Sequence, residues 1–238
     1  MHRLARSSVL AALALVSCGG LAQYPPTLRV ISTADAGHGS LREVLSGVGT
    51  SVPAGSRVVF DLAFPATITL ASPLPTITAD LTIEGPGRGA LEISGGGIVR
   101  PFVVDGGATL SISNLTILDG LAQGGAGQDG EGGGILVEDG RVEATNVLFF
   151  QNRAIGGAGA DGSGGGIYLR SGSLLLVGAF FVENEALRGA GGFGKGGGVY
   201  VLSGMVEFHA GNVFDDNVAS DPAGTASDDD DVFGFPHP

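Results

Sequence analysis

Two aspartates whose surroundings could serve metal binding lie in nearly identical glycine-rich stretches. Asp129 ends the sequence GGAGQD, and Asp161 ends GGAGAD 32 residues later. Both match the start of the calcium-binding pattern G-G-x-G-x-D. That pattern needs an apolar residue two places further on, where this chain has Glu131 and Ser163, and the third stretch has Phe193 in place of the aspartate. Because calcium prefers about six to eight oxygen ligands, we interpret both aspartates as loop residues, with a calcium site as the alternative.

Other carboxylates could serve acid–base chemistry on a polysaccharide. Such enzymes place two carboxyl groups around the bond they cleave, or combine carboxylates with a basic proton acceptor. Asp215–Asp216 and His38 superficially resemble fragments of polygalacturonase motifs, but they lie at opposite ends of the chain. We therefore expect no catalytic residue, with a polysaccharide lyase or glycoside hydrolase as the alternative function. The enzyme alternative depends on whether six carboxylates converge in space: Asp119, Asp129, Asp161, Glu183, Asp215 and Asp216.

Composition restricts the class of partner. The chain has 238 residues, of which 44 are glycine and 43% are apolar, and its formal net charge is −12. The apolar content predicts a folded protein and not a disordered one. Nucleic acids are excluded as partners because they require a basic surface to displace counterions. Anionic membrane surfaces are disfavoured for the same reason.

The N-terminus predicts export. A basic start, MHRLAR, precedes the apolar run SSVLAALALVS, which has the length of a signal peptide and is too short to span a bilayer. Residues 1–17 are therefore predicted to be a signal of the lipoprotein type, with Cys18, the single cysteine, as the lipidated first residue. Ordinary cleavage after Ala22 is the alternative. We expect an outer-membrane or cell-surface protein whose only membrane contact is a lipid anchor, or otherwise a secreted one.

A repeat of 32 to 33 residues occupies the second half of the chain. Copies begin at Gly132, Gly164 and Gly196, and a fainter copy without the glycine run begins at Arg100. Each copy holds three short strands, such as ILVE, RVEAT and VLFF. Apolar and polar residues alternate along the middle strand, with Val142 and Ala144 assigned to the inside. A repeat of this length and pattern predicts the stacked coils of a solenoid.

Two further residue types recur at equivalent positions of the copies, which also indicates stacked coils. Asparagine recurs at one position of each copy, where its amide can bond to the backbone of a tight corner. Phenylalanine recurs three residues earlier and is predicted to stack in the core. The asparagines are Asn152, Asn184 and Asn217, and the phenylalanines are Phe149, Phe181 and Phe214.

The units GGGI…FFQN and GGGI…FVEN resemble the repeats of the polymorphic outer membrane proteins and related bacterial surface β-helix proteins, and DAGHGSLREVL resembles the capped opening of that group. The resemblance implies a right-handed, pectin-lyase-like, single-stranded parallel β-helix of about six coils, all-β, with a short helix in an N-terminal cap. We accordingly divide the chain into the signal (1–17), an N-terminal segment and cap (18–56), the β-helix (57–220) and a solvated acidic tail (221–238).

Aromatic side chains could form a binding surface on this coil. If Ile135, Ile167 and Val199 point inward, then Tyr168 and Tyr200 stack on the outside. Exposed aromatic columns can bind glycans or proteins; the alternative is that they only stabilise the sheet or lie beneath the glycine-rich loops. The expected function is a non-enzymatic surface scaffold or adhesin-like module without a cofactor, with a glycan or protein ligand and no nucleic acid.

Overall fold

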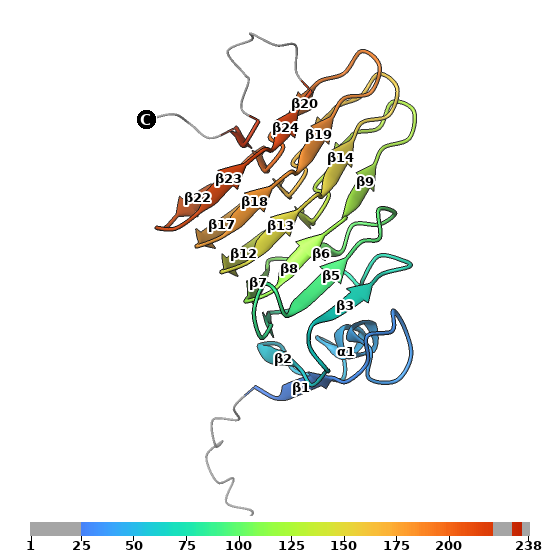
Figure 1. The fold of residues 1–238 in the computed structure, drawn as a ribbon, viewed down its shortest axis with the longest axis vertical. Coiled ribbons are helices and arrows are strands. Elements are labelled where there is room, and N and C mark those ends of the chain that lie inside the picture. The colour runs from blue at the N-terminus through green and yellow to red at the C-terminus, as the bar shows by residue number, and fades with distance from the viewer. Residues whose placement is uncertain (1–24, 221–229, 235–238) are drawn as a thin grey trace, which may run out of the picture.

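The structure, a computed structural model, describes residues 25–220 and 230–234. The described chain is nearly all β and forms a parallel β-helix of about six turns, with one short helix. Equivalent strands of successive coils lie side by side, and the coils run in chain order from the N-terminal cap to the last strands (Figure 1). The predicted fold class is confirmed.

Three parallel sheets form the walls of the coil. The seven-stranded sheet consists of β1 (Thr27–Val30), β2 (Ser56–Phe60), β4 (Leu81–Glu84), β7 (Ala108–Ser113), β12 (Gly140–Thr145), β17 (Gly172–Val177) and β22 (Met205–Phe208). The six-stranded sheet consists of β3 (Ala66–Thr69), β5 (Leu91–Ser94), β8 (Thr116–Leu118), β13 (Leu148–Phe150), β18 (Phe180–Val182) and β23 (Val213–Asp215). The five-stranded sheet consists of β6 (Phe102–Val104), β11 (Ile135–Val137), β16 (Ile167–Leu169), β21 (Val199–Val201) and β25 (Val232–Phe233).

The inside and outside positions predicted for the middle strand are confirmed in β12. Val142 and Ala144 are fully buried, whereas Arg141 and Glu143 on the same strand are partly exposed. The phenylalanine column stacks along the axis of the core. Ring centroids of Phe149 and Phe181 lie 4.6 Å apart, and those of Phe181 and Phe214 lie 4.9 Å apart. These spacings match the distance between neighbouring strands of a sheet, about 4.8 Å, because the three residues are register partners on adjacent strands of the six-stranded sheet.

The asparagine column is a hydrogen-bonded ladder inside the corner after the six-stranded sheet. Asn184 is fully buried, and its amide nitrogen donates to the carbonyl of Phe149 at 3.0 Å and to Oδ1 of Asn217 at 2.9 Å. Its own Oδ1 accepts from the backbone nitrogen and the amide nitrogen of Asn152, at 3.1 and 3.0 Å. The ladder satisfies polar groups of the tight corner that would otherwise be buried without partners.

The glycine-rich stretches contain more regular structure than the sequence predicts, which is three strands per coil. In the three coils that contain a glycine loop, two further short strands flank that loop. The four-stranded sheet consists of β9 (Leu121–Gln123), β14 (Arg153–Ile155), β19 (Glu185–Leu187) and β24 (Val218–Ala219). The three-stranded sheet consists of β10 (Gly130–Glu131), β15 (Gly162–Ser163) and β20 (Gly194–Lys195). The loops between these strands project together from one edge of the solenoid (Figure 1).

The glycine loops are held by backbone hydrogen bonds between coils. Gly127 donates its N–H to the carbonyl of Ala158 at 2.9 Å, and Gly159 donates to Ala190 at 2.8 Å. These bonds repeat the parallel ladder of the walls at the outermost part of each coil. The faint copy lacks a glycine loop, and there the Arg100 guanidinium donates to the backbone carbonyls of Glu131 and Gly132 at the edge of the three-stranded sheet.

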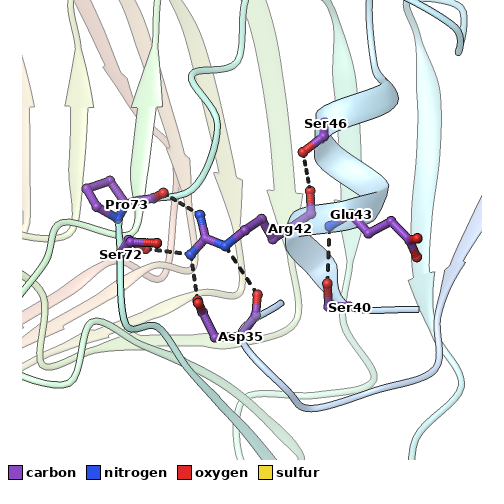
Figure 2. A network of polar contacts seen from close by, with 7 residues as sticks. All are labelled: Asp35, Ser40, Arg42, Glu43, Ser46, Ser72 and Pro73. Carbon is purple, nitrogen blue, oxygen red and sulfur yellow. Dashed lines mark hydrogen bonds and ion pairs between the residues drawn. The ribbon is translucent and has the colours of Figure 1, made fainter. Parts of the chain in front are cut away.

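The N-terminal cap contains α1 (Leu41–Gly47), whose Leu41 and Leu45 are buried against the first coils. Ser40 caps the helix by accepting from the N–H of Glu43 at 3.2 Å, as the capping-box pattern predicts. Figure 2 shows how Arg42 joins this cap to the solenoid: its guanidinium donates to Asp35 and to the carbonyls of Ser72 and Pro73. This short helix therefore covers the open end of the core.

The acidic C-terminal segment is more than a solvated tail. Residues 230–234 are described, and β25 (Val232–Phe233) pairs with β21 in the five-stranded sheet. Asp231 accepts from the amide of Asn217 at 2.9 Å, which adds a further rung to the ladder. Phe233 stacks on Tyr200 with ring centroids 5.3 Å apart. Residues 230–234, which include two aspartates of the run expected to be solvated, therefore pack on the last coil and continue its columns.

Candidate functional site

A column of outward-facing polar residues precedes the asparagine ladder at the same corner. Asp119, Gln151, Glu183 and Asp216 have φ between 50° and 54°, the left-handed region. This conformation turns the chain sharply, so the next residue enters the coil while the column residue faces solvent. The corner therefore displays one polar side chain per coil, with a repeat of about 4.8 Å along the solenoid axis.

This corner is hollowed into a groove of about 440 Å³, which we call the corner groove. Its walls come from the corner column and from the outer face of the four-stranded sheet. Four carboxylates and one guanidinium line it, so its formal charge is negative. The lining residues are Gly97, Asp119, Gly120, Leu121, Gln151, Arg153, Glu183, Glu185, Asp216 and Val218.

Neighbouring coils bond to each other within the corner groove. The amide nitrogen of Gln151 donates to Oε2 of Glu183 at 2.6 Å, and Nε of Arg153 donates to Oε2 of Glu185 at 2.8 Å. Glu183 and Asp216 are exposed to solvent. A carboxyl group that acts as a general acid at neutral pH is usually held protonated by burial in an apolar pocket. Glu183 and Asp216 do not lie in such a pocket, because both are exposed at the surface of the corner.

A second depression, which we call the sheet hollow, lies over the outer face of the six-stranded sheet. Its volume is about 640 Å³. Leu118, Leu148 and Phe150 supply apolar surface, and polar groups surround them. At its margin, the Arg88 guanidinium lies over the ring of Phe180, 3.7 Å from the ring centroid. The lining residues are Arg88, Gly89, Glu92, Thr116, Leu118, Asn146, Leu148 and Phe150.

The two aspartates of the calcium pattern lie in the glycine loops and bond to the coil above them. Oδ1 of Asp129 accepts from the N–H of Asp161, and Oδ1 of Asp161 accepts from the N–H of Phe193, each at 2.8 Å. Oδ2 of Asp161 also pairs with Nζ of Lys195 at 3.2 Å. Across residues 25–220 and 230–234, no group of three or more His, Cys, Asp or Glu side chains is placed to hold a metal ion.

The tyrosine column does not form the exposed surface considered from the sequence. Tyr168 and Tyr200 do stack, with ring centroids 4.9 Å apart, but only 4% of Tyr168 is exposed and Tyr200 is half-buried. Burial raises the pKa of both phenols above the ordinary range, and Glu131 adds to the effect at Tyr168. Glu131 belongs to β10 of the three-stranded sheet, so Tyr168 lies beside that sheet. An open aromatic binding surface is absent at Tyr168.

The enzyme alternative requires several carboxylates to converge in space. In the structure these carboxylates lie in separate places. Asp119, Glu183 and Asp216 line the corner groove, whereas Asp129 and Asp161 lie in the glycine loops. His38 is exposed in the N-terminal cap, 3.6 Å from a carboxylate oxygen of Glu43.

The sequence analysis did not identify three polar side chains of the corner groove: Gln151, Arg153 and Glu185. Each of them is a direct sequence neighbour of Asn152 or Asn184. Because these asparagines mark the corner of the coil, their neighbours could have been predicted to lie there.

Comparison with known proteins adds no relative. No known family model matches the chain, and no curated protein matches it either.

Among the described residues, no helix has the length and apolar character needed to cross a bilayer.

Proposed function

We propose that this chain is a non-enzymatic, exported β-helix protein that binds a glycan in the corner groove. The observation that supports this most is the match between the groove and a linear polymer. One polar side chain projects from each of four successive coils, and the adjacent sheet supplies further donors and acceptors. An extended chain of sugar rings has a repeat close to the coil spacing, so each ring can meet one rung of the column.

The charge of the corner groove favours a neutral or cationic glycan. Asp119 and Asp216 contribute negative charge without an ion pair within the described chain, and the single guanidinium, Arg153, is already paired with Glu185. An anionic polysaccharide would lose hydration at such a site without gaining an opposite charge. Hexasaccharides of glucosamine, N-acetylglucosamine and galacturonate test this, because they differ in charge.

We expect the glucosamine hexasaccharide to bind most tightly at mildly acidic pH, where its amines are protonated, and galacturonate to bind least. Glu183→Gln should weaken glucosamine binding about tenfold, since a hydrogen bond between charged groups contributes roughly 1.5–3 kcal/mol. The same change should affect the neutral oligomer less than threefold, a difference that isothermal titration calorimetry can measure. Glu207→Gln is the matched control, because Glu207 is an exposed carboxylate on β22 outside the groove. Equal affinity for all three oligomers, or equal loss in both variants, would contradict the proposal.

An enzyme is the second candidate, because the corner groove aligns carboxylates on neighbouring coils. Glu183 and Asp216 lie one coil apart, and Asp119 and Glu183 lie two coils apart, which corresponds to about 5 and 10 Å along the axis. Glycoside hydrolases separate their two carboxyl groups by about 5 to 10 Å. Incubation with the same oligosaccharides distinguishes the candidates: new reducing ends that disappear in Glu183→Gln would establish the enzyme and overturn the binding module.

We include export and lipid anchoring in the same proposal. The sequence of residues 1–22 supports both, although these residues lie outside the part of the chain that the structure describes. The resemblance to polymorphic outer membrane protein repeats also supports a place at the cell surface, as a pectin-lyase-like β-helix that displays its groove outward. We expect a fatty acid to label the wild-type protein in a bacterial host and not to label Cys18→Ser. Equal labelling of both proteins, or of neither, would exclude Cys18 as the anchor.

A further inference from the structure

The sheet hollow and the corner groove meet where β8 and β13 end. Leu118 and Phe150 line the hollow, and the residues that follow them, Asp119 and Gln151, line the groove. Consecutive residues are about 3.8 Å apart at their Cα atoms. The two depressions therefore adjoin at the end of β8 and β13, and a ligand that leaves the groove toward these strands enters the hollow.

The chemistry of the sheet hollow differs from that of the groove. Phe150, Leu148 and Leu118 give it an apolar surface, and its two charged side chains, Arg88 and Glu92, have opposite signs. The hollow therefore has no net formal charge and cannot select a ligand by charge. It can instead take a ring that has an apolar face and a polar edge, because aromatic and aliphatic surfaces bind the face while hydrogen-bonding groups bind the edge.

Arg88 supplies donors for such an edge. Its guanidinium is fixed over the ring of Phe180 by a cation–π contact. Its backbone carbonyl accepts from the Thr116 hydroxyl at 2.6 Å, which also holds this residue at the margin of the hollow. Within the described chain the guanidinium itself has no hydrogen-bond partner, so its N–H groups are available to a ligand.

We propose that the sheet hollow is a second subsite of the same glycan, in which one pyranose ring packs its apolar face on Phe150 and hydrogen-bonds with Arg88 and Glu92. This inference depends on the proposed function, since the corner groove holds the remaining sugar rings of the same glycan. It adds a length requirement: a short oligosaccharide fills the groove alone, whereas a longer one reaches both depressions.

The test compares a disaccharide and a hexasaccharide of glucosamine on Phe150→Ala. We expect the variant to lose about tenfold in affinity for the hexasaccharide, the effect of one lost aromatic contact, and to bind the disaccharide as the wild type does. Val182→Ala is the matched control, because Val182 pairs with Phe150 in register, is half-buried on the same face and lines neither depression. It should leave both affinities unchanged.

The outcomes separate the two proposals. An unchanged hexasaccharide affinity in Phe150→Ala, with binding by the wild type intact, overturns the subsite and leaves the groove. A loss of both ligands alike in Phe150→Ala, with a native thermal unfolding curve, also overturns it, because the length requirement is then absent. If the wild type binds neither oligosaccharide, the proposed function fails.

Discussion

Replacing Asn184 with alanine should lower the free energy of unfolding by about 4 kcal/mol. Asn184 is fully buried in the ladder, and its side chain bonds to three other residues. Alanine would leave the carbonyl of Phe149 and the backbone N–H of Asn152 without these partners, and each unsatisfied buried group costs about 1–3 kcal/mol. The measurement is the midpoint and slope of urea-induced unfolding followed by far-ultraviolet circular dichroism.

The adjacent residue provides the control for this ladder prediction. Glu183 is exposed and lies immediately before Asn184, so Glu183→Ala changes the same corner without touching the ladder. Its expected cost is below about 1 kcal/mol, as for an ordinary surface substitution. If Asn184→Ala and Glu183→Ala cost the same, the ladder does not stabilise the coil as described.

Replacing Gly157 with alanine should cost about 3 kcal/mol, the upper part of the range for overpacking. A Cβ at Gly157 would lie 1.7 Å from the carbonyl oxygen of Gly125 in the coil below. That atom is backbone, so it cannot move aside as a flexible side chain would. We therefore expect the glycine loops to separate at this coil, with lower protection of their amides in hydrogen–deuterium exchange.

Gly125 is the matched control, because it occupies the same column one coil earlier. A Cβ there has only the end of the Gln128 side chain as a near neighbour, at 3.0 Å. Gly125→Ala should therefore change stability by less than about 1 kcal/mol. A similar cost at both positions would show that the loops are not stacked backbone on backbone.

Much of the coil could be predicted from the sequence because each copy repeats the same side chains. The alternation of Val142 and Ala144 with polar residues identifies the inner face, and the recurrence of Asn152 and Asn184 identifies the corner. The order of the glycine loops could not be predicted in this way. Glycine there is required by the approach of a neighbouring backbone, as at Gly157, and that approach exists only once the coil below is in place.

The candidate site was less predictable, because residues of different copies form it. Glu183 and Asp216 stood out as carboxylates, but the sequence does not show that the outer faces of two successive strands enclose a groove. The binding role considered for Tyr168 and Tyr200 assumed an uncovered wall. Glu131, on the short strand β10, instead lies beside Tyr168 and contributes to raising its pKa.

The central claim, that a glycan binds in the corner groove, is tested most directly by titrating the isotope-labelled protein with glucosamine hexasaccharide and following backbone amide resonances by nuclear magnetic resonance. We predict shifts or broadening at Leu121, Arg153 and Glu185, which line the groove, and none at Gly127 and Gly159 in the projecting loops. Unchanged groove resonances, or changes confined to the loops, would contradict the account.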